Sequence, residues 1–316
     1  MTTITAKVIA HSSYPGCPDL ITMELTYNRF IHSEFMTHRE FSRNASSSRA
    51  IPVHEQLQMI LDDISTPMVW GPNKPGMQAG DELTGLKLWL AKKLWNTACY
   101  ANVGFARMLN ALGVHKQIVN RICEPYAHIK VLVTSTNWSN FLALRDHPDA
   151  QPEIRILAKA VRKALENSVP YELPVNGWHI PYVDKSDYDN WLAENSGKSV
   201  SETFMQVALK LSVARCARLS YTGFDGLRDM KKDLDLYFKL VGGTPVHASP
   251  AEHQASPMFS AGADLSGNLR GWLQYRKTLG NEAIHDTDHW RDEIPTSRTP
   301  AETRIVNVTS GFSETL

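Results

Sequence analysis

The polar run from His38 to Arg49 holds the residue types of this chain that are best suited to binding an anion. It reads HREFSRNASSSR and combines three arginines and one histidine with four serines. Guanidinium forks and hydroxyl groups bind phosphate oxygens better than other side chains do, and so polar a run cannot fill a core. Two interpretations follow: a solvated serine-rich loop after a strand, or a segment that surrounds a phosphate-bearing ligand.

Charge and composition restrict the partners of this run. Lys+Arg and Asp+Glu both number 33, so no long-range field attracts a nucleic acid polymer or an anionic membrane, and a mononucleotide bound by a few arginines fits better. The N-terminus lacks a secretory pattern and no long apolar run is present, so we expect a cytoplasmic protein without a membrane span. Four scattered cysteines predict reduced thiols and no disulfide framework or zinc site: Cys17, Cys99, Cys123 and Cys216.

Hydrophobic periodicity predicts the elements that must position the polar run. Alternating apolar and polar residues predict strands over 21–27 and 128–135. Apolar residues at three- and four-residue steps predict helices over 81–112, 115–122, 152–165, 200–217 and 229–240, and a helix or turn over 138–144. Gly113 ends the first of these helices, and we expect the second to close before Pro125. The apolar stripe of the first helix consists of Leu83, Leu86, Leu90, Leu94, Ala98, Ala101, Phe105 and Leu109.

The order of residues in the polar run carries more information than its composition. Read as H-R-x-x-S-x-N-x-x-S-x-R, the run resembles the signature of the flavin-dependent thymidylate synthases. A second segment, Leu144 to Ile154 (LRDHPDAQPEI), is similar to the L-R-x-x-x-x-A-Q-x-E-I segment of the same family. The match in the first run falls on His38, Arg39, Ser42, Asn44, Ser47 and Arg49.

A third part of the resemblance lies late in the chain. Leu211 to Tyr221 resembles the segment that usually opens this family, and His247 to His253 (HASPAEH) resembles the H-x-S-P-x-E-H segment that follows it. The usual order places both before the strand that leads to the H-R-x-x-S segment. We therefore predict a circularly permuted family member, with a core over 1–170 and 208–282, a connector or insertion over 171–207 and an extended tail over 283–316.

The resemblance implies an α/β (α+β) fold, with an antiparallel or mixed sheet flanked by helices, that assembles as a homotetramer with shared active sites. It implies FAD as cofactor, with NADPH and 5,10-methylenetetrahydrofolate as co-substrates, and a one-carbon transfer to C5 of dUMP, a pyrimidine deoxynucleoside monophosphate. No enzyme cysteine attacks the base in this scheme.

The resemblance also implies roles for individual residues. Ser47, Arg49 and Arg121 would bind the nucleotide phosphate, and Arg145 would stabilise negative charge on the pyrimidine as the catalytic residue. The alternatives are a surface salt bridge for Arg145 and a helix C-terminal cap for Arg121. The flavin would contact His38, Arg39, Asn140, Ser249 and Glu252, and Ser220 and His247 would line the flavin or folate pocket.

Four positions depart from the family pattern: Thr37 in place of arginine, Ala45 in place of glutamate, Asp149 where histidine is common, and Glu34 where glutamine is common, close to the nucleotide. A carboxylate at Glu34 would accept a hydrogen bond from a cytosine amino group. A second hypothesis is therefore the same chemistry on dCMP, which would give a 5-methyl or 5-hydroxymethyl product. A third is a nucleotide- or flavin-binding protein without turnover.

Two late features remain outside this scheme. The stretch 267–277 combines aromatic residues with three cations and could lie beside the folate or the flavin adenine, although an amphipathic edge with extended cations is the preferred interpretation. His285 and His289, with Asp286 and Asp288 nearby, have a spacing that predicts an exposed tail and no metal site.

Overall fold

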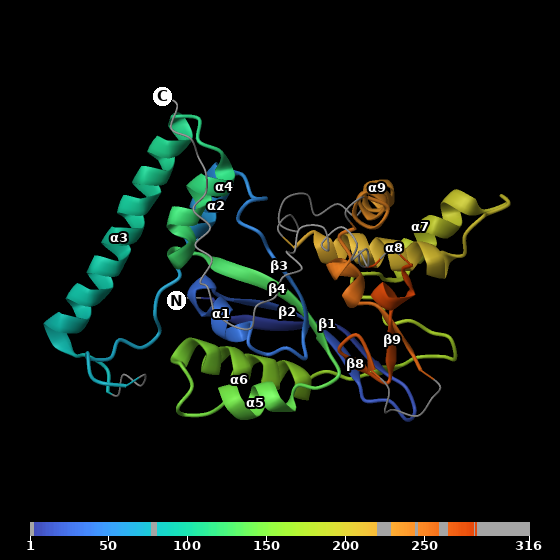
Figure 1. Ribbon diagram of the computed structural model, residues 1–316, viewed down its shortest axis with the longest axis horizontal. Coiled ribbons are helices and arrows are strands. Elements are labelled where there is room, and N and C mark those ends of the chain that lie inside the picture. Colours follow the sequence, from blue (N-terminus) through green and yellow to red (C-terminus); the bar gives the residue numbers. More distant parts are fainter. Residues whose placement is uncertain are drawn as a thin grey trace, which may run out of the picture. The chain divides into compact units, whose positions relative to one another are not determined.

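A mixed five-stranded sheet carries the polar run at one edge (Figure 1). This computed structural model describes residues 3–76, 81–219, 229–243, 246–258, 265–280 and 282. All neighbouring strands are antiparallel except β1 and β5, which run parallel, so the predicted antiparallel or mixed sheet is confirmed as mixed. In spatial order the strands are β3 (Ser42–Ala45), β4 (His128–Ser135), β2 (Leu20–Asn28), β1 (Thr5–Ser13) and β5 (Tyr171–Glu172).

Alternation along β2 and β4 places apolar side chains on one face of the sheet. Met23 and Leu25 of β2 lie opposite Val133 and Val131 of β4, and all four are fully buried. Phe141 packs into the same cluster from the helical layer that covers this face. This layer consists of three short elements, η1 (Arg29–Ile31), α1 (His32–Phe35) and α5 (Ser139–Arg145), and one longer helix, α6 (Pro152–Glu166).

The opposite face is covered by elements from the second half of the chain: α7 (Lys185–Asn195), α8 (Phe204–Ala217), α9 (Met230–Val241) and the 3-10 helix η3 (Ser249–Glu252) (Figure 1). A buried ion cluster joins the three helices. Arg215 donates to both carboxylate oxygens of Asp187 at 2.7 Å and through Nε to Asp233 at 2.8 Å. A buried cation of this kind is tolerated because its donors are paired.

A chain of buried hydrogen bonds connects this second layer to the sheet. His179 joins Ser12 through Nδ1 at 2.8 Å and Thr22 through Nε2 at 2.7 Å. The chain continues from Thr22 to Thr134 at 2.6 Å and from Thr134 to Nδ1 of His253 at 2.8 Å. Burial lowers the pKa of both histidines to about 3, so both rings are neutral at pH 7.

A separate apolar cluster forms around the long helix α3 (Gly85–Ala111), with α2 (Val53–Asp62), α4 (Lys116–Val119) and η2 (Asn120–Tyr126). Cys99, Val103 and Ala106 of α3 are buried in this cluster. The opposite side of α3 is also apolar, since large side chains recur there at helical spacing and remain exposed. These residues are Leu86, Leu90, Leu94, Phe105 and Met108, and the exposed Leu112 follows directly after the helix.

The last described elements are short strands and one turn of helix: β6 (Ala255–Pro257), β7 (Leu265–Ser266), β8 (Leu269–Arg270), β9 (Trp272–Gln274) and η4 (Tyr275–Thr278). Trp272 is fully buried and donates through Nε1 to the carbonyl of Pro18 at 2.8 Å. The stretch 267–277 thus contributes to the core as well as to an edge.

The predicted strands over 21–27 and 128–135 are confirmed, as are the helices over 81–112, 152–165, 200–217 and 229–240, within a few residues at their ends, and the helix or turn over 138–144 is a helix. The helix predicted over 115–122 was expected to end before Pro125. That end is wrong, because α4 continues directly into η2, which includes Pro125. The predicted connector contains β5 and α7. Residues 1–282 form one compact unit. The tail over 283–316, with its two histidines, lies outside the described residues.

Candidate functional site

Arg145 ends α5 and extends its guanidinium toward the polar run. Its Nε donates to Nε2 of His38 at 2.9 Å, and its Nη2 donates to the hydroxyl of Thr37 at 3.2 Å. The Thr37 hydroxyl donates in turn to the carbonyl of Glu34 at 2.7 Å, which leaves its lone pairs for Arg145. Among the described residues no carboxylate lies within ion-pair distance of Arg145, since the adjacent Asp146 pairs with Arg162. The cation therefore has neutral acceptors only.

His38 is buried among aromatic rings, and its ring centroid lies 5.0 Å from that of Phe141 in an edge-to-face arrangement. Burial, together with the nearby cations Arg145 and Arg43, lowers its pKa to about 4. The imidazole is therefore neutral at pH 7. Because Nε2 accepts the hydrogen bond from Arg145, the ring proton lies on Nδ1. His38 thus fixes the direction of the guanidinium without neutralising it.

Glu34, the position where the family often has glutamine, lies one turn before His38 and is partly buried. Burial raises the pKa of its carboxyl, Arg145 lowers it and Glu153 raises it. Glu34 is therefore within electrostatic reach of Arg145. Glu153 is itself buried and accepts hydrogen bonds from the Met68 amide at 2.6 Å and the Gln151 side chain at 3.1 Å.

Arg43 belongs to the candidate site, although no role was predicted for it. Its Nη1 donates to the carbonyls of Met36 at 2.9 Å and His38 at 3.0 Å, and so holds the loop between α1 and β3 in place. Burial lowers the pKa of Arg43, while Tyr27 and Glu252 nearby oppose that shift. Arg43 thus connects the His38 loop electrostatically to the Glu252 segment.

The predicted phosphate residues lie in the turn that follows β3. The amide of Ala50 donates to the carbonyl of Ser47 at 3.0 Å and closes this turn. Asn120, at the start of η2, holds the turn in place because its amide nitrogen donates to the carbonyls of Ser48 at 2.7 Å and Ile51 at 3.0 Å. The turn and η2 therefore share one surface of the molecule.

Arg49 and Arg121 are exposed on this surface. Arg121 lies next to Asn120, with Nη1 4.0 Å from Glu124, and it contacts no helix carbonyl among the described residues, so the C-terminal cap does not form. Arg49 makes no hydrogen bond or ion pair within the described part of the chain. No contact in that part joins these two arginines to Arg145, so one chain presents the two groups separately.

The H-x-S-P-x-E-H segment forms η3 and its flanks. Glu252 is partly buried and pairs with Arg276, which the sequence did not assign to the site. The other predicted cofactor residues of this part of the structure are exposed: Arg39, Asn140, His247 and Ser249. Ser220, also predicted, lies outside the described residues. Glu252 and Arg43 lie within electrostatic reach of each other, so the structure brings this segment and the polar run together.

The cysteines have the chemistry of unreactive thiols. Burial raises the pKa of Cys99 and of Cys123 to about 11, and it raises those of Cys17 and Cys216 as well. All four are therefore protonated at neutral pH, whereas a nucleophilic cysteine acts as its thiolate. The described residues also contain no group of three or more histidine, cysteine, aspartate or glutamate side chains arranged for a metal ion.

Residues 19–171, which include both arginine groups, match the family described as thymidylate synthase complementing protein. Over this segment the chain is similar to that family. The match confirms the resemblance to flavin-dependent thymidylate synthases and supports a nucleotide-methylating enzyme of the thymidylate synthase type. It ends before α7, so α8, α9 and η3 lie outside it.

Similar solved structures include the UMP/dUMP methylase PolB from Streptomyces cacaoi in two forms. The form bound with 5-Br dUMP is 14% identical in sequence, and the match covers 52% of this chain and 90% of the PolB chain, with a TM-score of 0.44. The form bound with 5-Br UMP is 15% identical and covers 52% and 89%, also with a TM-score of 0.44. No protein of curated function matches the sequence. Within the described residues, no helix has both the length and the apolar character needed to cross a membrane.

Proposed function

We propose that this protein is a flavin-dependent thymidylate synthase that acts on dUMP. It would transfer the one-carbon unit of 5,10-methylenetetrahydrofolate to C5 of the uracil ring. Loss of the C5 proton would then release tetrahydrofolate, and hydride would reduce the remaining methylene group to methyl. The observation that carries this proposal is the Arg145 guanidinium, held by His38 and Thr37 and without a carboxylate partner among the described residues.

Arg145 is suited to stabilise negative charge that develops on a pyrimidine ring. A guanidinium stays charged in a partly buried site and offers a planar pair of donors to a ring oxygen and nitrogen. Its neutral partners orient it without offsetting its charge, so the full cation is available to the pyrimidine. Electrostatic stabilisation of this kind increases the nucleophilicity of C5, because the anionic form of the ring carries electron density there.

The phosphate of the nucleotide would bind Ser47, Arg49 and Arg121. The turn that carries Ser47 and Arg49 is fixed to η2 by Asn120, so the three side chains are positioned by backbone contacts and not by the ligand. The exposed guanidinium of Arg49 has no partner in the described part of the chain. Charge-assisted hydrogen bonds from two arginines would bind a phosphate dianion strongly.

The residues present fit a flavin by the chemistry of their donor set. Arg39 and Asn140 are exposed and make no hydrogen bond within the described residues, so a cation and an amide remain for a pyrophosphate and a polar ring edge. Neutral His38 and Glu252 complete the set. When bound, reduced FAD supplies the hydride that converts the transferred methylene group to methyl, and NADPH restores the reduced form.

The separation of the two arginine groups favours an active site shared between subunits of a homotetramer. The exposed apolar side of α3 supports self-association, since an apolar face of this length is costly in water. Mixing Arg145→Ala with Arg121→Ala subunits tests this directly. If each site takes one arginine from each of two subunits, random assembly restores roughly one quarter of wild-type activity. Sites contained in single chains would restore none.

The permuted chain order is also part of this proposal. The segments that resemble the usual opening of the family, α8 and η3, pack on the same sheet that begins near the N-terminus, although they come last in the sequence. The contact of Thr134 in β4 with His253 is one of the hydrogen bonds between them. Chain connectivity can change in this way when the packed elements keep their contacts.

Glu34 favours a second candidate, the same chemistry on dCMP. Its carboxylate is coupled electrostatically to Arg145, where it could accept a hydrogen bond from the amino group of cytosine. Glu34→Gln distinguishes the two candidates. An enzyme that reads cytosine through Glu34 loses turnover of dCMP in this variant, whereas an enzyme for dUMP keeps its turnover.

The decisive experiment offers equal amounts of dUMP and dCMP to the protein with FAD, NADPH and methylenetetrahydrofolate. Mass spectrometry of a single turnover then identifies the product. Methylation of dUMP is the expected result, and modification of dCMP alone would establish the second candidate. Tight nucleotide binding without any product would indicate a binding protein without turnover, and a protein that cannot be loaded with flavin would refute the flavin-dependent chemistry.

A further inference from the structure

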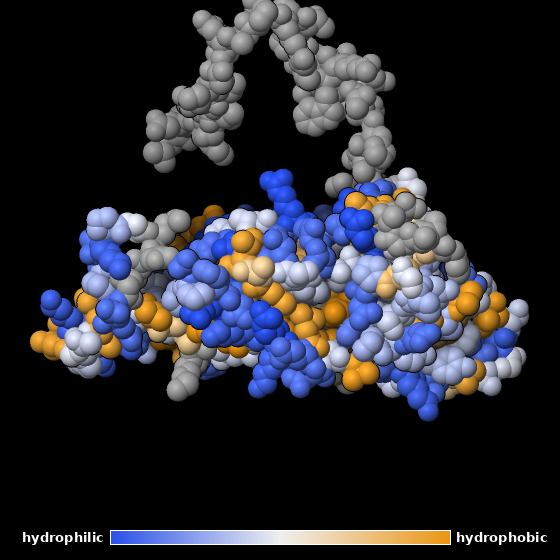
Figure 2. All heavy atoms as spheres, turned by 90° about the horizontal axis from the view of Figure 1, so that it is seen from below, coloured by the Kyte–Doolittle hydropathy of each residue, from blue (hydrophilic) through white to orange (hydrophobic). Residues whose placement is uncertain are grey.

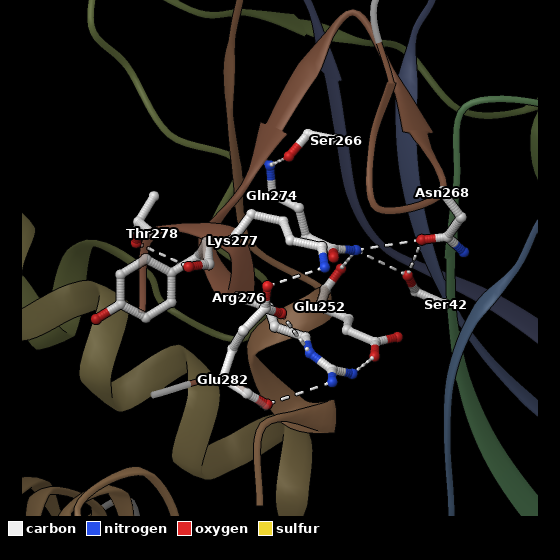
Figure 3. A network of polar contacts seen from close by, with 10 residues as sticks. Ser42, Glu252, Ser266, Asn268, Gln274, Arg276, Lys277, Thr278 and Glu282 are labelled. Atoms are coloured by element: carbon white, nitrogen blue, oxygen red, sulfur yellow. Dashed lines mark hydrogen bonds and ion pairs between the residues drawn. The ribbon is translucent and has the colours of Figure 1, made fainter. Parts of the chain in front are cut away.

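Residues 265–282, which lie beyond the family match and beyond the hallmark motifs, contact both segments that are expected to bind the flavin (Figure 3). We propose that Gln274 and Arg276 are positioning residues of the flavin site: Gln274 joins the Ser42 strand to the Glu252 turn, and Arg276 sets the direction of the Glu252 carboxylate. This inference rests on the proposed flavin-dependent function.

Gln274 is the centre of the contact. It is buried, and its amide nitrogen lies 3.1 Å from Ser42 Oγ, 3.2 Å from the Glu252 carbonyl and 3.2 Å from Asn268 Oδ1 (Figure 3). The amide nitrogen of Gln274 carries two protons and has three acceptors within reach, so its hydrogen bonds are shared among the three. Ser42 Oγ also donates to Asn268 Oδ1 at 2.8 Å. One side chain therefore connects three segments that are up to 232 residues apart in the sequence.

The chain around Gln274 is shaped for this contact. Strands β7 and β8 form a hairpin whose two-residue loop is Gly267 and Asn268. Gly267 has φ +63, and a Cβ at this position would lie 2.4 Å from Oε1 of Gln274, so only glycine leaves room for the buried amide. The loop presents Asn268, whose Nδ2 also donates to the carbonyl of Glu40 at 3.1 Å.

Arg276 acts on the second flavin segment. Its Nη1 donates to Oε1 of Glu252, and its Nε donates to Glu282 at 3.0 Å (Figure 3). The other oxygen of Glu252, Oε2, has no hydrogen bond within the described residues. Arg276 thus holds the carboxylate by one oxygen and leaves the other for a hydroxyl or N–H donor of a bound ligand.

The effect of this contact extends to the nucleotide side of the site. Glu252 lies within electrostatic reach of Arg43, whose guanidinium holds the His38 carbonyl. His38 in turn accepts the hydrogen bond that orients Arg145. A carboxylate turned away from Arg43 would therefore change the electrostatic environment of the guanidinium that holds the His38 loop, as well as the flavin contact itself.

The test compares a variant without either ion pair of Arg276 with a variant that keeps the pair to Glu252. Arg276→Gln loses the contacts to Glu252 and Glu282, whereas Glu282→Gln keeps the Glu252 contact and loses the pairs of Glu282 with Arg276 and Lys277. We expect Arg276→Gln to raise the Kd for FAD about tenfold or more, as loss of a charge-assisted contact would, and Glu282→Gln to leave it unchanged. Arg276→Lys, which keeps the charge without the fork, should restore part of the affinity.

Fluorescence titration with FAD, the visible absorption band of bound flavin and the Tm of the protein without flavin separate positioning from folding. A purely structural tether would lower Tm in both variants and leave the Kd of the folded protein unchanged, and that result would overturn the inference. If Arg276→Gln does not fold, Arg276→Lys with wild-type Kd and wild-type band shape would overturn it equally. Failure of the wild-type protein to bind FAD would refute the proposed function, and this inference with it.

Discussion

Mild acid should destabilise the protein through His253, whose ring is fully buried where η3 meets the sheet. Burial lowers its pKa to about 3, whereas an unfolded chain protonates histidine near pH 6.5. Between pH 6.5 and pH 3 the unfolded state therefore binds a proton at this histidine that the folded state does not bind. Its contribution to stability is complete above pH 6.5 and is lost as the pH falls from 6.5 toward 3.

The size of this effect follows from the pKa difference. Each pH unit below 6.5 costs about 1.4 kcal/mol, so the free energy of unfolding falls by about 2 kcal/mol at pH 5. His179 has a pKa that is also lowered to about 3, and it adds a similar loss. Asparagine at position 253 can place its amide near Nδ1 and retain the Thr134 contact. His253→Asn should therefore remove about half of the loss between pH 7 and pH 5 that these two histidines cause.

Urea unfolding followed by tryptophan fluorescence at pH 7, 6 and 5 measures this difference. The control is His54→Asn, because the His54 side chain is 82% exposed and its removal also takes one histidine from the protein. The comparison uses the change in unfolding free energy with pH, so any constant cost of a variant cancels. An equal pH dependence in wild type and both variants would show that the buried ring does not titrate in this way.

Three further outcomes are expected. Arg145→Lys keeps the charge but loses the fork and the Nε contact to His38, and should lower kcat roughly 100-fold or more with little change in Tm. Because burial raises the pKa of Glu34, its ionisation costs folding free energy as the pH rises through that pKa, so Glu34→Gln should raise Tm near pH 8 and not near pH 4 in calorimetry. Leu94→Glu with Phe105→Glu should reduce the mass measured by light scattering to that of a smaller assembly.

Periodicity predicted the regular elements well where one face is more apolar than the other. β2 alternates from Ile21 to Tyr27 because one face packs on the helical layer, β4 departs from alternation at the buried Leu132, and α6 has a single apolar stripe. The long helix α3 behaves differently. The residues that revealed it, such as Leu86, Leu90 and Leu94, are exposed, while its buried face is formed by smaller side chains. A pattern of spacing identifies a helix, but it cannot decide which of two apolar faces meets the core.

Residues of the candidate site could be named from the sequence where they belong to a local motif, and not where distant segments meet. His38 and Arg145 came from motifs, and the structure joins them by a hydrogen bond. Arg43 lies inside the motif, but its role depends on the path of the loop that precedes it. Gln274 and Arg276 lie more than 200 residues from the polar run, and nothing in their local sequence indicates Ser42 as a neighbour. Contacts of this kind depend on the packing of the second layer.

The strand β3 explains how so many separate segments meet at one place. Successive side chains of a strand point to opposite faces, so Ser42 contacts Gln274 in one layer while Arg43 contacts the His38 loop in the other. As an edge strand, β3 also leaves one side open to loops. Each layer docks on β3 and β4 through its own contacts and does not depend on the order in which the chain supplies it. The proposed rearrangement of the chain order would therefore leave the site intact, provided that the contacts of Ser42, Arg43 and Thr134 are kept.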